Sequence, residues 1–530
     1  MVSRARSKNF GPPPEPPGGR AGGDFRGRSP ARAAPATRPA PRRPATATCR
    51  GVMTPSSPPT RRALLAGAAL ALVPARPRAQ APQPAGPGAA PGGPAPAPEP
   101  RILTAAPATA RLRPDAPAET PVWAFDGRSV PPVLRVKRGE AVRLRLDNRT
   151  DKPLSLHWHG VRNANAMDGV GGVTQAPVAP GASFLYAFTP PDAGTALIRP
   201  LVVGGASEPA GRGLAGLLVV EEAKPPVVDR DVPLVLQDWR LEPDGTLAGF
   251  GPLPFAASSG RLGNTLTVNG RPGPEAIAAP PGARLRLRLA NACNARATRL
   301  RFDKLKVWVA AVDGQPTDTF EPLRATLPFP PGTRYDVLLD VPSGKEGGGT
   351  VTALIGPGIP LAVVTPEGEA LPARPPVAAI GENPLLPPEI KLQNAVRRDL
   401  TLAGGATLDK ARPEAPPAYA GDPARIWTVN GAAGTAGAAP LFSVKRGSVV
   451  VLALTNQTAF PQSLHLHGHV FRLLHPLDDG WEPYWLDTFQ LLEGRTARIA
   501  FLADNPGRWL VSATALERFD TGLWTSFEVT

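Results

Sequence analysis

The chain has 530 residues, enough for about three domains by length alone. It contains 70 Pro and 55 Gly and is only 6% aromatic, a composition that favours many short strands and turns over long helices. The formal net charge of +15 suggests a nucleic-acid partner at first sight. However, residues 1–100 hold 15 Lys/Arg and only 3 Asp/Glu, so residues 101–530 are close to neutral and no nucleic-acid partner is expected.

An export signal is expected near the N-terminus. Two adjacent arginines, Arg61 and Arg62, precede an apolar run of about ten residues, which is too short to cross a bilayer as a helix. This pattern is typical of twin-arginine signal peptides and predicts delivery to the periplasm. No longer apolar stretch follows, so the mature chain is expected to lack a transmembrane segment. The expected N-terminal segments are a disordered extension or overcalled start over residues 1–52, a signal peptide over residues 53–79 and a Pro/Ala/Gly-rich tether over residues 80–100.

The chain contains two cysteines, Cys49 and Cys293. Removal of the leader would leave only Cys293, so no intrachain disulfide is expected despite the oxidising compartment. No histidine lies near Cys293 in the sequence, which favours a small buried residue over a nucleophile.

One pattern occurs three times after residue 100. A turn glycine is followed nine residues later by an asparagine, with a strand of alternating apolar residues between them. Repeats of this length are whole-domain duplications, and short alternating strands predict β-sandwiches with Greek-key connections. The predicted fold is therefore all-β, with three tandem sandwiches over residues 101–222, 229–368 and 396–530. The Gly–Asn pairs are Gly139–Asn148, Gly282–Asn291 and Gly447–Asn456, and a second shared turn follows each at Gly181, Gly332 and Gly494.

Two histidine motifs lie near opposite ends of this region. The first contains His157 and His159, and the second contains His465 and His467. A His-x-His motif on a strand places two imidazoles on one face, because side chains alternate. Two such pairs facing each other would supply four nitrogen ligands for one Cu(II) or Zn(II) ion. The alternative is that the four rings are packing residues hydrogen-bonded to the backbone.

These motifs, the three-sandwich frame and turns such as Asp168-Gly169 and Asn505-Pro506-Gly507-Arg508-Trp509 resemble the multicopper oxidases, laccase-like enzymes built from three cupredoxin domains. The resemblance extends over residues 101–530. It implies that His157, His159, His465 and His467 stand at positions that hold type 2 and type 3 copper in the family. It also implies that other copper ligands of the family are replaced, by Arg199, Leu201, Gln462, Ser512, Ala513, Thr514 and Arg518, with Leu523 at the axial position.

The replacements remove the electron-entry site of the family. A blue copper requires a thiolate and two imidazoles, and the matching positions hold Ala513, Gln462 and Arg518. Of the six imidazoles that hold the type 3 pair, only His159 and His467 remain, and a guanidinium cannot lose its proton to coordinate a metal. The full four-copper complement is therefore not expected, one copper ion at the residual histidines stays open, and no catalytic residue is assigned.

The favoured function is a non-oxidase pseudoenzyme that binds or scaffolds an unidentified envelope protein or small ligand. This resembles the copper-free, twin-arginine-exported branch of the family that is linked to bacterial cell division. The alternatives are a laccase-like copper oxidoreductase acting on phenols or metal ions, and a periplasmic copper-buffering protein. Asp168 and Asp487 are interpreted as turn or hydrogen-bonding residues, His469 as a strand residue at the edge of the site and His475 as near the surface.

Overall fold

The computed structural model describes most of the chain after the predicted tether. The expected extension, signal peptide and most of the tether, together with Cys49 and His475, lie outside the described residues. In the part that is described, no helix is long and apolar enough to cross a membrane. The described residues are 99–251, 253–343, 347–409, 411–412, 415–474 and 480–530.

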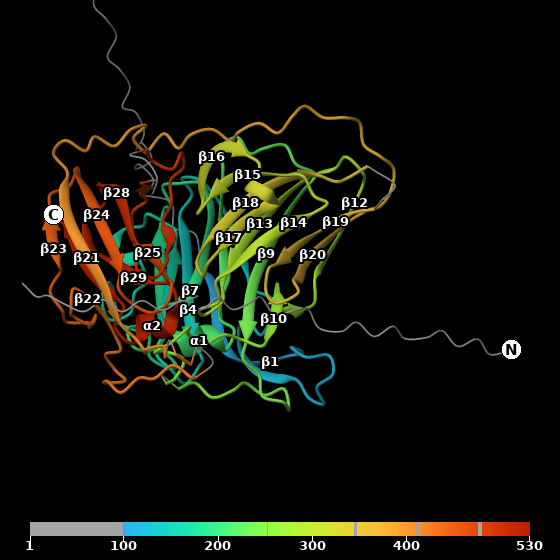
Figure 1. The fold of residues 1–530 in the computed structure, drawn as a ribbon. Coiled ribbons are helices and arrows are strands. Elements are labelled where there is room, and N and C mark those ends of the chain that lie inside the picture. The colour runs from blue at the N-terminus through green and yellow to red at the C-terminus, as the bar shows by residue number, and fades with distance from the viewer. Residues whose placement is uncertain (1–98, 252, 344–346, 410, 413–414, 475–479) are drawn as a thin grey trace, which may run out of the picture. The chain divides into compact units, whose positions relative to one another are not determined.

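The described residues fold almost entirely into strands, which form six sheets, two from each of three consecutive stretches of chain (Figure 1). The first stretch contains β1 Arg101–Ala110, β2 Thr120–Phe125, β3 Val133–Lys137, β4 Val142–Asn148, β5 Leu156–His159, β6 Ser183–Phe188, β7 Gly194–Pro200 and β8 Gly216–Glu221. Its sheets have the strand orders β2-β1-β4-β6 and β3-β8-β7-β5.

The second stretch contains β9 Arg230–Trp239, β10 Thr265–Val268, β11 Arg271–Pro272, β12 Glu275–Ala279, β13 Arg284–Asn291, β14 Thr298–Asp303, β15 Val307–Val312, β16 Gln315–Phe320, β17 Thr326–Phe329, β18 Arg334–Asp340, β19 Gly349–Ala353 and β20 Ile359–Pro366. Its strand orders are β11-β10-β9-β13-β18-β15-β16 and β12-β20-β19-β14-β17.

The third stretch contains β21 Val396–Gly404, β22 Trp427–Val429, β23 Phe442–Val444, β24 Ser448–Asn456, β25 Gln462–Leu466, β26 Arg472–Leu473, β27 Thr488–Leu491, β28 Thr496–Ala503, β29 Gly507–Ala513 and β30 Trp524–Val529. Its strand orders are β22-β21-β24-β28-β26 and β23-β30-β29-β25-β27. The short helices are α1 Ser207–Gly211 and α2 Leu516–Asp520, with single 3-10 turns η1 Asn165–Met167 and η2 Leu323–Ala325.

The three pairs of sheets share one topology. In each, the first long strand pairs in parallel with the strand that carries the repeated asparagine: β1 with β4, β9 with β13 and β21 with β24. In the second sheet of each pair, an early edge strand pairs in parallel with the last strand: β3 with β8, β12 with β20 and β23 with β30. The predicted all-β fold of three tandem sandwiches is confirmed.

The repeated Gly–Asn spacing has a structural reason. Asn148, Asn291 and Asn456 end β4, β13 and β24 and are fully buried. Each side-chain amide donates to two backbone carbonyls, and each side-chain oxygen accepts from the amide two residues later. The main-chain oxygens of the three asparagines accept hydrogen bonds from the glycines of the second shared turn, Gly181, Gly332 and Gly494. The two repeated sequence elements therefore bond to each other at one end of every sandwich.

The first and third sandwiches are in direct contact, and this contact brings β5 and β25 together. β5 lies at the edge of its sheet beside β7, and β25 lies between β27 and β29. Figure 1 shows α1 of the first sandwich next to α2 of the third. A buried apolar cluster joins the first and third sandwiches. It is formed by Val170, Leu201, Ala206, Leu510, Leu516, Phe519 and Trp524.

Candidate metal centre

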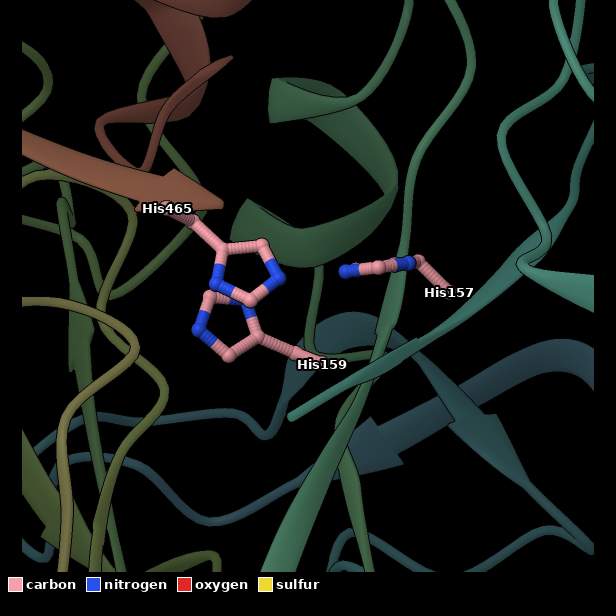
Figure 2. A group of neighbouring side chains, drawn as sticks. All are labelled: His157, His159 and His465. Carbon is pink, nitrogen blue, oxygen red and sulfur yellow. The ribbon is translucent and has the colours of Figure 1, made fainter. Parts of the chain in front are cut away.

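The four histidines of the two motifs converge into one buried cluster. The ring centroids of His159 and His465 lie 3.7 Å apart with the rings stacked, and the ring of His157 lies 5.4 Å from that of His465. His467 completes the group, 4.4 Å from His157. Figure 2 shows the stacked pair with His157, which lies on the same strand as His159, directed toward it. All four residues are at most 3% exposed.

The hydrogen bonds of His157 and His465 leave the same nitrogen free on each ring. Nδ1 of His157 lies 2.8 Å from the main-chain oxygen of Asp168, and Nδ1 of His465 lies 3.0 Å from that of Asp487. A carbonyl oxygen can only accept, so Nδ1 carries the proton and the neutral ring holds its lone pair on Nε2. Nε2 of His157 is buried and has no hydrogen-bond partner among the described residues. Such backbone contacts are the ones that orient metal-binding imidazoles.

His159 has the opposite tautomer. Its Nε2 lies 2.8 Å from the hydroxyl of Thr488, and that hydroxyl lies 2.7 Å from a carboxylate oxygen of Asp487. The hydroxyl donates to the carboxylate, so it accepts from Nε2 of His159, whose lone pair is then on Nδ1. One nitrogen of each of His157, His159 and His465 lies within 4.8 Å of the others. Three neutral imidazoles at this spacing fit one Cu(II) or Zn(II) ion.

His467 differs because both of its nitrogens have partners. Nδ1 lies 2.9 Å from a carboxylate oxygen of Asp168, and Nε2 lies 2.9 Å from the hydroxyl of Ser512. The carboxylate accepts from Nδ1, so Nε2 accepts from the serine hydroxyl. Ser512 stands where the resembled family has a histidine. Its hydroxyl donates a hydrogen bond to the lone pair on Nε2 of His467. A metal bound by His467 would have to displace this hydroxyl.

Burial keeps His159, His465 and His467 neutral near pH 7. Removal from water lowers the pKa of His465, lowers that of His159 well below its usual value, and lowers that of His467 to about 3. Burial by itself would raise the pKa of the Asp168 carboxyl, but its contacts with His157 and His467 outweigh burial and hold that pKa low. Neutral imidazoles beside an ionised carboxylate are the protonation states that metal binding requires.

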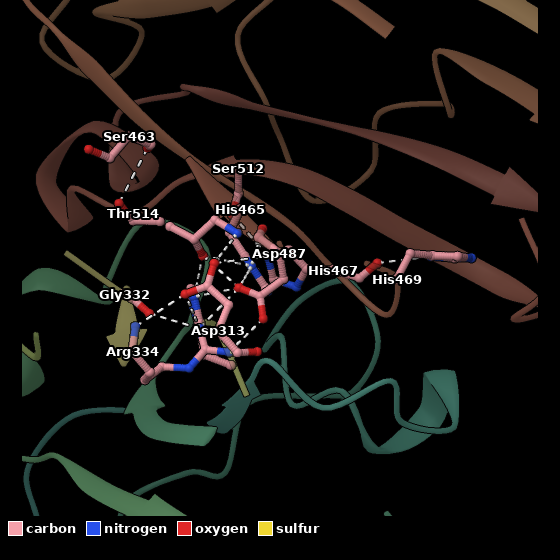
Figure 3. Close-up of polar contacts among 12 residues, drawn as sticks. Asp313, Gly332, Arg334, Ser463, His465, His467, His469, Asp487, Ser512 and Thr514 are labelled. Atoms are coloured by element: carbon pink, nitrogen blue, oxygen red, sulfur yellow. Dashed lines mark hydrogen bonds and ion pairs between the residues drawn. The ribbon is translucent and has the colours of Figure 1, made fainter. Parts of the chain in front are cut away.

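A buried charge network supports the cluster from the second sandwich. Arg334 begins β18, is fully buried, and its guanidinium donates to both carboxylate oxygens of Asp487, at 3.0 and 2.6 Å. It also donates to the main-chain oxygens of Thr195 in β7 and of Asp313. Figure 3 shows Arg334, Asp313 and Asp487 in one network with His465. Arg334 therefore joins all three sandwiches at the residue that orients His465.

The sequence analysis predicted Asp168 and Asp487 to be hydrogen-bonding residues. In the structure, the Asp168 carboxylate accepts from His467 and the Asp487 carboxylate accepts from Arg334. Arg334 and Asp313 were not predicted. Arg334 begins a strand that also contains Asp336 and Asp340, and charged residues are usually exposed, so the sequence gives no signal that singles it out.

Two glycines leave room for these side chains. A Cβ on Gly160 would lie 2.0 Å from the guanidinium of Arg334, and a Cβ on Gly332 would lie 2.8 Å from the ring of His159. Both glycines have positive φ, +97° and +88°, which side chains also disfavour. Close approach of backbone to the cluster therefore requires glycine at both positions.

The buried guanidinium of Arg518 lies at the positions that match the electron-entry copper site of the resembled family. Arg518 donates to the side-chain oxygen of Gln462 and to the main-chain oxygens of Pro461 and Ser258. Its guanidinium carbon lies 4.9 Å from the centre of the Trp427 ring. Burial lowers the pKa of Arg518 to about 10, so the group stays charged at neutral pH. These contacts fill the place with a cation that cannot bind a metal.

Arg199 is a second buried cation beside the cluster. It pairs with His157 across β5 and β7, and its guanidinium donates to the main-chain oxygen of Thr514 at 3.0 Å. Burial lowers its pKa to about 10, which leaves it charged. Arg199 and Thr514, which stand at two positions of copper ligands in the resembled family, are thus hydrogen-bonded to each other.

Cys293 and His469 lie away from the cluster. Cys293 is buried in the second sandwich, with its sulfur 3.8 Å from the main-chain oxygen of Leu236, and burial raises its pKa well above the usual value. His469 was predicted to be a strand residue, but β25 ends at Leu466. Its ring instead packs in the core of the third sandwich against three aromatic rings, and Figure 3 shows it pointing away from the network.

The fold and the site define a protein of three cupredoxin-like sandwiches with a histidine cluster between the first and the third. Three family models described as multicopper oxidase match residues 108–225, 230–347 and 410–530. The crystal structure of a multi-copper oxidase from Pseudomonas thermotolerans superimposes with a TM-score of 0.71 at 30% identity, over 82% of this chain and 99% of that one. The chain belongs to the multicopper oxidase family, which binds copper.

Two curated relatives carry different names. Multicopper oxidase MmcO of Mycobacterium tuberculosis is 27% identical over 426 residues, which are 73% of this chain and 79% of that protein. Cell division protein FtsP of Dickeya dadantii is 31% identical over 261 residues, 45% of this chain and about half (49%) of that protein. The family therefore includes relatives named for oxidation and relatives named for cell division.

Proposed function

We propose that this chain is a non-oxidase member of the multicopper oxidase family that acts as a binding or scaffold protein in the cell envelope. The observation that carries the proposal is the hydrogen-bonded pair of Arg518 and Gln462 beside Ala513, at the positions that match the electron-entry site. None of these side chains offers a thiolate or an imidazole, and both are needed for a blue copper.

The complete set of four coppers does not fit the residues present. Besides the missing thiolate, Arg199 and Ser512 stand at matching type 3 positions and are bonded to Thr514 and His467. Oxygen reduction by the family route needs both an electron-entry site and a complete cluster. We therefore derive no oxidation step for this chain.

Two features support an envelope role. The similarity to proteins named FtsP supports a function of that kind, with an envelope protein or a small ligand as partner. The signal peptide predicted over residues 53–79 supports export to the periplasm by the twin-arginine route.

A second candidate function, metal buffering, is favoured by the free Nε2 of His157. A buried nitrogen with no partner is unfavourable unless a ligand satisfies it. His157, His159 and His465 would hold one Cu(II) or Zn(II) ion, with Asp168 and Asp487 orienting the rings. A single ion held by three imidazoles would be stored or transferred by this chain, with no relay to carry electrons to it.

One preparation distinguishes these functions. Residues 80–530 would be purified, loaded with copper and freed of excess metal, and then bound copper per chain, the visible spectrum and oxygen uptake with a phenol would be measured. Binding of no copper and no turnover supports the scaffold function. One pale copper per chain, lost in the variant His157→Ala/His465→Ala but kept in the control His469→Leu, supports buffering. An intense blue colour with oxygen uptake would refute both.

A further inference from the structure

Thr488 is held beside the histidine cluster by contacts with more than one sandwich. It begins β27 and is 3% exposed. In the antiparallel pair of β25 and β27 it stands directly opposite His465, so its side chain lies on the same face of the sheet as that ring. Its main-chain amide donates to a carboxylate oxygen of Asp313 in the second sandwich, at 3.0 Å. The strand position and this hydrogen bond therefore place the hydroxyl of Thr488 next to the cluster.

The direction in which the Thr488 hydroxyl donates is fixed by a carboxylate. Its Oγ1 lies 2.7 Å from Oδ1 of Asp487. Both oxygens of that carboxylate accept from Arg334, whose guanidinium keeps its protons, so the carboxylate acts only as an acceptor. If the hydroxyl donated to His159 instead, lone pairs of two oxygens would face each other at 2.7 Å. The hydroxyl therefore donates to Asp487 and accepts from Nε2 of His159, 2.8 Å away.

The Nε2 edge of the His159 ring is occupied from two sides. Besides the hydroxyl of Thr488, the backbone of Gly332 lies against this edge, because a Cβ on that glycine would lie 2.8 Å from Cε1 and 2.9 Å from Nε2. One face of the ring is covered by His465, with 3.7 Å between the ring centroids (Figure 2). Nδ1 is therefore the nitrogen of His159 that is left for an ion, and it can bind one only while it carries no proton.

We propose that Thr488 is a positioning residue for metal binding, because its hydroxyl holds the proton of His159 on Nε2 and so leaves Nδ1 as the donor to the ion. This role rests on the metal-buffering function proposed above and names the residue that selects the donor nitrogen. The hydrogen bonds run from Arg334 in the second sandwich, through Asp487 and Thr488 in the third, to His159 in the first. A hydrogen bond to one nitrogen of an imidazole determines which nitrogen is free to bind a metal.

Nitrogen-15 NMR of metal-free residues 80–530 tests this role without a bound ion. The chain has six histidines, so labelling of histidine alone gives few signals, and the variant His159→Gln identifies those of His159. In a neutral ring the protonated and the unprotonated nitrogen have well-separated chemical shifts. We expect the proton of His159 on Nε2 in the wild type and in Thr488→Ser, which keeps the hydroxyl. In Thr488→Val, which removes the hydroxyl and keeps the branched shape, we expect a mixture of both tautomers.

The affinity for Zn(II), measured by competition titration, is the second readout. Thr488→Val should weaken binding of one Zn(II) ion about 10- to 100-fold, as is usual when a residue that orients a metal-binding imidazole is lost. Thr488→Ser should retain the affinity of the wild type. The matched control is Thr455→Val, because the hydroxyl of Thr455 on β24 bonds to that of Thr496 at 2.8 Å on the exposed surface. The control should change neither the Zn(II) affinity nor the tautomer of His159.

The two readouts separate the role of Thr488 from the buffering function. If the wild type binds no Zn(II), buffering is wrong, and the NMR spectra still decide whether Thr488 sets the tautomer of His159. The role of Thr488 is wrong if His159 carries its proton on Nδ1 in the wild type, or if the proton stays wholly on Nε2 in Thr488→Val. It is also wrong if Thr488→Ser loses as much Zn(II) affinity as Thr488→Val. Thr488→Ala removes the same hydroxyl and takes the place of Thr488→Val if that variant does not fold.

Discussion

Replacement of Arg334 by methionine should destabilise the whole molecule. The arginine is fully buried between Asp487 and Asp313, which are at most 1% exposed. Removing the cation leaves two buried carboxylates without a counter-charge and frees main-chain oxygens in β7 and near Asp313. Breaking a buried ion pair from one side costs about 3–5 kcal/mol, so we expect Arg334→Met to lower the free energy of unfolding by roughly that amount.

The pH dependence of this loss follows from the carboxylates. Burial and the charge of Asp487 already raise the pKa of Asp313 to about 7. Without Arg334 the pKa of the Asp487 carboxyl should rise as well, so the folded variant holds a proton that the unfolded chain releases. A raised folded-state pKa gives stability that is present at low pH and lost as pH rises. The deficit of Arg334→Met should therefore be larger at pH 7.5 than at pH 5.5.

Urea denaturation followed by tryptophan fluorescence measures both effects. A double variant with Asp487→Asn should lose less than the sum of the single changes, by about 0.5–3 kcal/mol, because the groups interact directly. The matched control is Arg301→Met, since Arg301 is 45% exposed and pairs with Asp303 at the surface, where such pairs contribute about 1 kcal/mol or less. A loss below about 1 kcal/mol for Arg334→Met, or a loss independent of pH, would refute the reasoning.

Three further predictions concern single residues. His157→Ala should weaken binding of one Zn(II) ion about 10- to 100-fold. His467→Ala should change Zn(II) binding less than threefold, because the hydroxyl of Ser512 already bonds to Nε2 of His467. Equal losses for the two variants in competition titrations would contradict this assignment. Burial lowers the pKa of His469 to about 4, so stability present above pH 6.5 should fall by about 3 kcal/mol as pH drops toward 4 in metal-free protein, and His469→Leu should flatten that curve in urea titrations. Cys293 should resist iodoacetamide at pH 8 and react only in urea; rapid alkylation of the native chain would show that it is not buried.

Much of the histidine cluster could be predicted because His157 and His159 lie two residues apart on one short strand, which places both rings on the same face. Strand alternation is a local rule, and it held for β5. It failed for the second motif, where β25 ends at Leu466 and His467 lies in a turn. Gly468 has φ +66°, and a Cβ there would lie 2.3 Å from the ring of Trp509. Glycine is therefore required in the turn after β25, where the backbone packs closely against Trp509.

The fold could be predicted from the amino-acid sequence alone, since the Gly–Asn spacing recurs three times. Residue types such as Ala513, which has no donor atom, also predict from the sequence alone that copper ligands of the family are missing. Only the tertiary structure decided which ring nitrogens are free, that Ser512 is hydrogen-bonded to His467, and that Arg334 joins three sandwiches. The physical reason is that periodicity acts between near neighbours, whereas hydrogen-bond partners and burial are set by residues hundreds of positions apart.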